Sequence, residues 1–230
     1  MHLWFIGALV LLLAGLALWL LQEPRTRGIP FRGKLPGNAL IVVFSDSPCQ
    51  NTRRLAVWLH EATGAPILPL QVKDPYPGGY WRTVARARRE LKAGTTPELS
   101  RECQVDLSPY QVVFLGSPVW WGQGAPPVRR FLQEHGGLAG KEVVPFATHG
   151  GGGVAGTFRL WRKECPQARF REGLSLRGSS LPERIAGRTL ADHCSPDLVA
   201  QWLNRLYPSP DDAPGEGRGG APSPDFPSSP

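Results

Sequence analysis

Short apolar runs alternate along this chain with longer segments in which apolar residues recur at helical spacing. Residues 39–44 and 112–115 are uninterrupted apolar runs too short for helices, which is typical of strands buried on both faces of a sheet. This alternation predicts an α/β fold built on a doubly wound parallel sheet with right-handed crossovers. Strands are predicted over residues 39–44, 66–72, 112–115, 141–148 and 169–176, and helices over residues 52–63, 80–93, 126–132, 154–165 and 198–206.

The first 23 residues have a different pattern. Residues 3–21 contain no charged side chain, and 19 residues at ~1.5 Å each span about 29 Å, close to the ~30 Å hydrocarbon thickness of a bilayer. Basic residues follow this segment, beginning at Arg25 and Arg27, whereas only Met1 and His2 precede it. This favours an uncleaved anchor over a cleaved signal peptide, and predicts a single-pass protein of the cell membrane whose domain faces the cytoplasm.

The remaining boundaries follow from composition. Residues 24–38 are rich in Pro, Gly and Arg and lack periodicity, which predicts a linker between an anchor at 1–23 and a domain at 39–207. Residues 208–230 are rich in Pro, Gly and Ser and have little to bury, which predicts a disordered tail.

The bulk composition, 41% hydrophobic and 20% charged, is that of a globular protein. Its net charge of +7 comes largely from arginines scattered along the predicted helices, with no recognised nucleic-acid motif. We therefore expect no nucleic-acid partner, but a basic surface that favours anionic partners or membrane headgroups. The four cysteines lack the spacing of zinc ligands and the density of a disulfide scaffold; we expect free thiols, with one disulfide as the alternative if the domain faces an oxidising compartment.

A loop follows each of three successive central strands. In a doubly wound parallel sheet the carboxyl ends of these strands meet at one edge, so the three loops are expected to lie side by side. The first loop leads into a helix N-terminus, which attracts an anion, the second carries two adjacent indoles suited to stacking, and the third has four consecutive glycines that let backbone N–H groups approach a ligand. A phosphate site, a flat-ring site and a polar edge together describe flavin mononucleotide, FMN. The predicted contacts are Ser45, Ser47, Gln50, Asn51 and Thr52 in the first loop, Pro118, Val119, Trp120, Trp121 and Gly122 in the second, and Thr148, His149, Gly150, Gly151 and Gly152 in the third.

The most specific motifs are GSPVWWGQGAPPVRRFL and FATHGGGG. With these motifs, residues 39–206 resemble the flavodoxin-like family, in particular small bacterial FMN-binding proteins with a PVWW motif. The resemblance implies a five-stranded sheet of order 2-1-3-4-5 and non-covalent FMN. It also implies electron transfer or oxidoreductase activity toward a redox partner protein or a small quinone-like acceptor. Since the flavin does the chemistry, no catalytic acid, base or metal is predicted.

The first loop departs from the family pattern. It has two extra residues and no glycine, while Pro48 lacks an N–H donor and Asp46 adds a negative charge where the phosphate is expected. A cofactor-free flavodoxin-fold interaction module tethered to the membrane is therefore the alternative. A phosphatase-like role for Cys49 is disfavoured, because such a thiol needs an arginine where this chain has Leu55.

Overall fold

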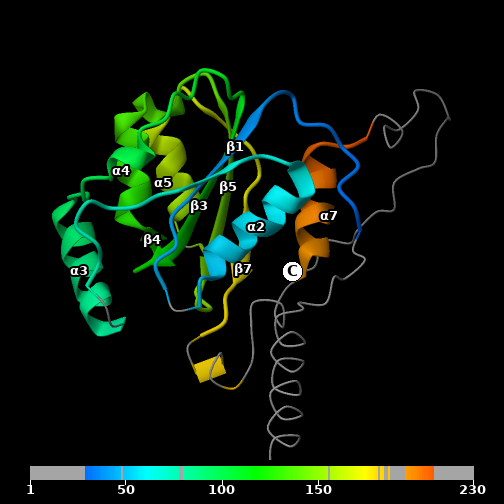
Figure 1. The fold of residues 1–230 in the computed structure, drawn as a ribbon. Helices are drawn as coiled ribbons and strands as arrows, with labels where there is room; N and C mark the ends of the chain where they lie inside the picture. Colours follow the sequence, from blue (N-terminus) through cyan, green and yellow to red (C-terminus); the bar gives the residue numbers. More distant parts are fainter. Residues whose placement is uncertain are drawn as a thin grey trace, which may run out of the picture.

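The computed structural model describes residues 29–47, 49–77, 80–154, 156–180, 182–183, 186 and 195–209. A parallel sheet forms the middle layer, with α2 and α7 on one face and α3, α4 and α5 on the other (Figure 1). The strands are β1 (Ala39–Val43), β2 (Ile67–Pro69), β3 (Val112–Trp120), β4 (Gln123–Gly124), β5 (Glu142–His149), β6 (Arg169–Phe170) and β7 (Leu174–Arg177). The helices are α2 (Asn51–Thr63), α3 (Tyr80–Ala93), α4 (Pro126–Glu134), α5 (Thr157–Glu164) and α7 (Pro196–Leu206), with short 3₁₀ turns at η1 (Arg101–Cys103) and η2 (Gly136–Leu138).

The apolar run of β1 divides between two cores. Ile41 and Val43 point toward α2 and α7, while Leu40 and Val42 belong to the opposite core with α4 and α5. Successive residues of a strand face opposite sides, so a strand covered on both faces must be apolar throughout. This confirms the α/β prediction and the double coverage of the central strands.

The order of the strands differs from the predicted five-stranded 2-1-3-4-5. Along the sheet the order is β2-β1-β3-β5-β6, with β7 also pairing with β5, and the two-residue β4 pairing antiparallel with β3. Toward the outer edge, β5 pairs with β6 at Glu142 and Val143 and with β7 from Phe146 to His149. The break between β6 and β7 lies opposite Pro145, which has no backbone N–H to donate.

Strand β3 is more than twice as long as predicted. The apolar run was expected to end at Leu115, with Gly116 and Pro118 opening a loop, yet the strand continues to Trp120. Ser117 and Pro118 pair with Ala147 and Thr148 of β5, and this long-range pairing extends the strand beyond its apolar segment. The prediction that Pro118, Val119 and Trp120 lie in a loop is therefore wrong.

The predicted membrane localisation is also corrected. Within the described ranges no helix combines the length and the apolar composition needed to cross a bilayer. The longest of these helices, α3, has 14 residues and extends about 21 Å, against a hydrocarbon thickness of ~30 Å. The predicted span at residues 3–21 and the predicted tail from residue 210 onward lie outside the described residues.

Candidate functional site

The register of the sheet brings the three predicted loops to one edge. Val43, the last residue of β1, pairs with Gly116 of β3, and two residues later Pro118 pairs with Thr148 of β5. Thr148 in turn pairs with Leu176 of β7. The loops that follow β1, β3 and β5 therefore leave the sheet side by side, and the segment after β7 joins them.

The first loop ends in an open helix N-terminus. Gln50 adopts a left-handed conformation with φ of 47° and, with its backbone and side-chain nitrogens, donates to the Ser47 carbonyl at 3.0 and 2.7 Å. No side chain caps α2 by a hydrogen bond, and its first turn holds no acidic residue. The leading N–H groups of a helix have no intrahelical acceptor, so this end attracts an anion.

Two of the predicted contact residues also contact each other. The Oγ1 atoms of Thr52 and Thr148 lie 2.7 Å apart, and both side chains are buried. This bond ties the start of α2 to the end of β5. Two hydroxyl groups carry two protons and their mutual bond uses one, so the pair retains a proton for a further acceptor.

The segment after β7 forms a wall that the sequence did not predict. Asn51 donates from Nδ2 to the Ser179 carbonyl at 2.9 Å, and a Cβ on Gly178 would lie only 2.4 Å from that same nitrogen. The Ser179 hydroxyl is buried and has no hydrogen-bond partner among the described residues. The sequence alone did not indicate a role for Gly178 or Ser179, which follow a weakly predicted strand. Their role depends on contact with Asn51, which lies 128 positions from Ser179 in the sequence.

The two indoles of the second loop face different surroundings. Trp120 is half-buried and meets Phe44 and Tyr76 edge-on, with ring centroids 5.5 and 5.2 Å apart. Trp121 is 53% exposed, with φ of 52°, and donates from Nε1 to the Val84 carbonyl of α3 at 3.3 Å. Trp120 therefore forms a fixed wall just above β1, whereas Trp121 faces solvent beside α3.

The turn between the indoles and α4 is held by a buried serine. Ser117 is fully buried; its Oγ donates to the Pro118 carbonyl and accepts from the Ala125 N–H, each at 2.8 Å. Between these points Val119 pairs with Gly124, and Gly122 takes φ of 77° in the turn. These contacts fix the hairpin that presents both indoles.

A charged network holds Tyr76 against Trp120. The Tyr76 hydroxyl donates to Glu90 Oε2 at 2.5 Å, and Arg86 Nε donates to Glu90 Oε1 at 2.8 Å. The Arg86 guanidinium also lies 4.5 Å from the centre of the Tyr76 ring and pairs with Asp74 at 3.0 Å. Burial, together with the Glu90 carboxylate, raises the pKa of Tyr76. The predicted helix at 80–93 is thus confirmed, but the charged residues Arg86 and Glu90 are largely buried supports for the aromatic wall.

The third loop uses some of its N–H groups internally. His149 accepts at Nδ1 from the N–H groups of Gly151 and Gly153, at 3.0 and 3.1 Å. The Gly151 N–H is therefore already used within the loop. Gly150 and Gly152 have open space around them. Burial and the Arg177 charge lower the pKa of His149, and since its Nδ1 accepts two hydrogen bonds, the ring is neutral with its proton on Nε2.

Asp46, the residue that the sequence placed against an anion, lies in the first loop within electrostatic reach of Tyr76. Its charge contributes to the raised pKa of Tyr76, and burial raises the pKa of the Asp46 carboxyl itself. Ser45 and Ser47, on either side, are half-buried.

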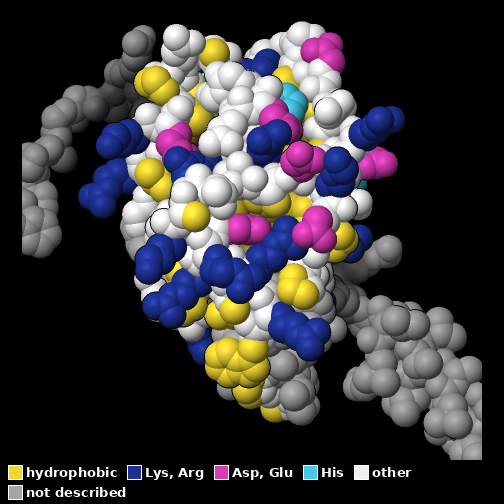
Figure 2. Space-filling model, turned by 90° about the vertical axis from the view of Figure 1, so that its left-hand side faces the viewer, with side chains coloured by type: hydrophobic (Ala, Val, Ile, Leu, Met, Phe, Trp, Pro, Cys, Tyr) yellow, Lys and Arg dark blue, Asp and Glu magenta, His cyan; other side chains and the backbone are white. Residues whose placement is uncertain are grey.

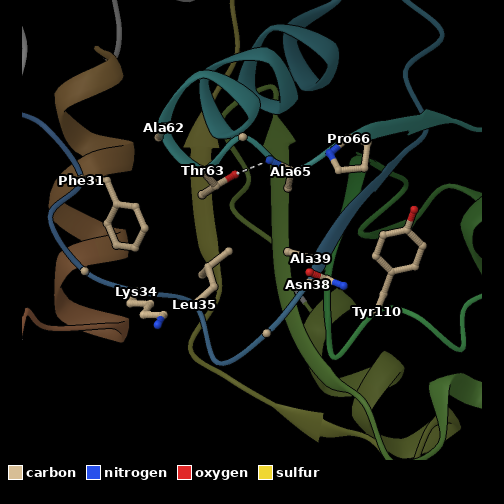
Figure 3. Close-up of a pocket in the computed structure, with 13 residues that line it drawn as sticks. Phe31, Lys34, Leu35, Asn38, Ala39, Ala62, Thr63, Ala65, Pro66 and Tyr110 are labelled. Atoms are coloured by element: carbon tan, nitrogen blue, oxygen red, sulfur yellow. Dashed lines mark hydrogen bonds between the residues drawn. The ribbon is translucent and has the colours of Figure 1, made fainter.

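A cavity of about 530 Å³ lies at the opposite edge of the sheet (Figure 3). Residues 31–39, the C-terminal end of α2 and Tyr110 surround it, and inside it the Thr63 hydroxyl accepts from the Ala65 N–H at 3.2 Å. Since β1 begins at Ala39, this is the amino edge of the strands, remote from the three loops. It contains none of the predicted contact residues.

Comparisons with known proteins identify the relatives of this chain. A sequence model described as "Flavodoxin" matches residues 38–204. Among solved structures, a candidate flavoprotein from Bacteroides eggerthii is similar, with 25% identity and a TM-score of 0.60 over 74% of this chain and 98% of that one. One from Bacteroides uniformis has 26% identity and a TM-score of 0.58 over 73% and 98%. A flavoprotein from Lactobacillus acidophilus in complex with FMN has 20% identity and a TM-score of 0.51 over 61% and 93%. No curated protein matches.

Proposed function

Because this chain belongs to the flavodoxin family, we propose that it binds FMN non-covalently at the carboxyl edge of its sheet and passes electrons to or from a redox protein or a quinone-like acceptor. The fold supports a flavoprotein, and the similar Lactobacillus acidophilus structure holds FMN. The observation that carries the proposal is the uncapped N-terminus of α2 beside the buried Ser179 hydroxyl, which has no hydrogen-bond partner in the described part of the chain.

The donors at this end fit a phosphate. The leading N–H groups of α2 and the remaining hydroxyl proton of the Thr52 and Thr148 pair lie at this terminus. Ser179 is held beside it by the hydrogen bond from Asn51 to the Ser179 carbonyl. Backbone and hydroxyl donors would thus hold the anion, as helix N-termini do for phosphates.

We propose that the Trp120 side chain lies against one side of the flavin ring. It is anchored edge-on between Phe44 and Tyr76, so its position costs no side-chain ordering when a ligand arrives. Gly150 and Gly152, which leave open space in the third loop, would line the polar edge of the ring. When bound, the flavin supplies reversible uptake of electrons, and the protein positions it and excludes water.

The test is a titration of the full chain with FMN and, in parallel, with riboflavin, which lacks the phosphate. We expect saturable binding of FMN with quenching of its fluorescence, and at least about tenfold weaker binding of riboflavin, since one to two charge-assisted hydrogen bonds are lost. In Ser179→Ala the ratio of the two affinities should fall by roughly tenfold, as one hydroxyl donor to the phosphate is removed. A chain that takes up neither ligand would refute the proposal and favour the cofactor-free module.

Ser175→Ala is the matched control. Ser175 lies on β7, four residues before Ser179, and is exposed. It should leave both affinities unchanged. Equal losses in the two variants would indicate a disturbed β7 rather than a lost phosphate contact. Ser179→Ala should also unfold at no lower denaturant concentration than the parent, because among the described residues the buried hydroxyl has no hydrogen bond to lose.

A further inference from the structure

The outer face of α3 is strongly basic. This helix carries five cationic residues and one acidic residue. Arg86 and Glu90 pair with each other on its inner side, where Val84 and Ala87 also lie, so the outer face keeps only positive charge. Figure 2, which looks onto this side of the molecule, shows Lys and Arg side chains gathered over α3. The exposed cations are Arg82, Arg88, Arg89 and Lys92.

Two indoles are exposed on the same face. Trp81 is 79% exposed and Trp121 is 53% exposed, among the most exposed large hydrophobic side chains of the described residues. The Arg88 guanidinium lies 4.8 Å from the centre of a Trp121 ring. Trp121 also holds a left-handed backbone conformation that is uncommon for a bulky residue, and such strain gathers at functional positions. We call Trp81, Arg82, Arg88, Arg89, Lys92 and Trp121 the α3 basic face.

This combination differs from an ordinary solvated helix surface. A charged stripe that only keeps a protein soluble needs no aromatic side chains, whereas Trp and Arg are the residues enriched where protein partners bind. Trp81, Arg88 and Lys92 are spaced at i, i+7 and i+11 along one helical stripe, so a single partner surface can reach them together. The charge of this face calls for an acidic partner.

We propose that the α3 basic face docks an acidic redox protein that exchanges electrons with the cofactor. This rests on the proposed function, because it makes the docked protein the source or the acceptor of those electrons. Trp121 directly follows Trp120, the wall proposed for the flavin ring, and its indole is fixed to the Val84 carbonyl of α3. A partner on this face is therefore held beside the edge where the cofactor would lie.

The probe is an acidic [2Fe–2S] ferredoxin, and the first measurement is its association with the full chain without added flavin, at low and at high ionic strength. Arg82→Glu combined with Arg89→Glu should slow association about tenfold at low salt, and much less at high salt where charges are screened. The control is Arg32→Glu combined with Arg205→Glu, two exposed residues on the α7 side. It changes net charge equally and should slow association by less than about twofold.

Trp81→Ser tests the apolar part of the face. It should speed dissociation several-fold while leaving the association rate unchanged, because interface packing acts mainly on dissociation. Equal slowing by both charge-reversed pairs would overturn the proposal, since overall charge would then explain the effect. The absence of ferredoxin binding would also overturn the proposal. A third contrary result would be that binding of single-stranded DNA or anionic vesicles depends on Arg82 and Arg89 whereas binding of ferredoxin does not.

The two proposals fail separately. Ferredoxin docking is measured without flavin, so a chain that docks ferredoxin on α3 yet takes up no FMN refutes the proposed function and leaves the docking surface standing. A chain that binds FMN but transfers electrons to ferredoxin equally well in both charge-reversed pairs refutes the α3 basic face and leaves the proposed function standing.

Discussion

Gly116→Ala is the substitution whose cost follows most directly from the structure. Gly116 lies in β3 in register with Phe146 of β5, and a Cβ built on it would stand 2.1 Å from Phe146 Cζ and 2.3 Å from Cε2. Ordinary contact between carbon atoms requires about 3.6 Å, so the ring must retreat by about 1.5 Å. Phe146 is fully buried, and closely packed neighbours limit that movement.

Two opposing effects set the size of the change. Alanine should stabilise a strand by ~0.5–1 kcal/mol relative to glycine, because it loses less backbone entropy on folding. Overpacking a filled core costs ~1–3 kcal/mol or more, and a ring displaced by about 1.5 Å belongs at the upper end. We therefore expect a net loss of roughly 2 kcal/mol in the free energy of unfolding, a large share of a total of ~5–15 kcal/mol.

Urea unfolding followed by tryptophan fluorescence measures this change. Phe146→Leu by itself should lower the free energy of unfolding by about 1–2 kcal/mol, since it opens a cavity. Gly116→Ala combined with Phe146→Leu should cost at least ~1 kcal/mol less than the sum of the two single substitutions, because the added methyl group fills that cavity. Gly152→Ala is the control: its Cβ meets no atom within 4 Å, so little change is expected. A neutral Gly116→Ala, or strictly additive losses, would refute the packing argument.

Other substitutions test the site. Asp46→Asn should raise FMN affinity several-fold at neutral pH, because it removes a negative charge from the first loop. The gain should shrink as pH falls toward the raised pKa of Asp46, where the wild-type carboxyl also loses its charge. A gain in affinity that does not vary with pH would contradict this reasoning. The pKa of His149 in the folded chain is lowered from 6.5, so the unfolded chain protonates the imidazole more readily and the free energy of unfolding falls as pH drops below about 6.5. Urea unfolding at about pH 5 and about pH 7.5 measures this fall, which His149→Gln should lessen. Glu90→Gln should cost about 1–3 kcal/mol in urea unfolding, since Arg86 loses its buried charged partner, and should also weaken FMN binding through Trp120; unchanged stability would show that Asp74 suffices.

Local pattern predicted the elements better than it predicted their ends. The apolar run of β1 and the helical face of α3 follow from periodicity, which acts over a few residues. Gly116 was interpreted as the end of a strand, whereas it provides room for the Phe146 ring. That difference depends on a residue 30 positions away in sequence, and a single sequence does not reveal such pairings.

The site was predicted in outline for the same reason. Parallel strands bring their carboxyl ends together whatever the loops contain, so three of the four segments at this edge follow from strand order. The fourth, at Ser179, became visible only through its contact with Asn51. Likewise Arg86 is one of several arginines along the predicted helix at 80–93, and the sequence does not distinguish it from the others, although Tyr76, Asp74 and Glu90 surround it.

The two outer margins of the sheet are both short and interrupted. On one side β2 has three residues and ends at Pro69. On the other side β6 and β7 have two and four residues, and the break between them lies opposite Pro145 of β5. A long, straight edge strand exposes unpaired N–H and C=O groups with which a strand of another chain can pair, and such pairing starts aggregation. Short edge strands and prolines oppose this pairing. Two copies of this protein are therefore not expected to join sheet to sheet, even when crowded.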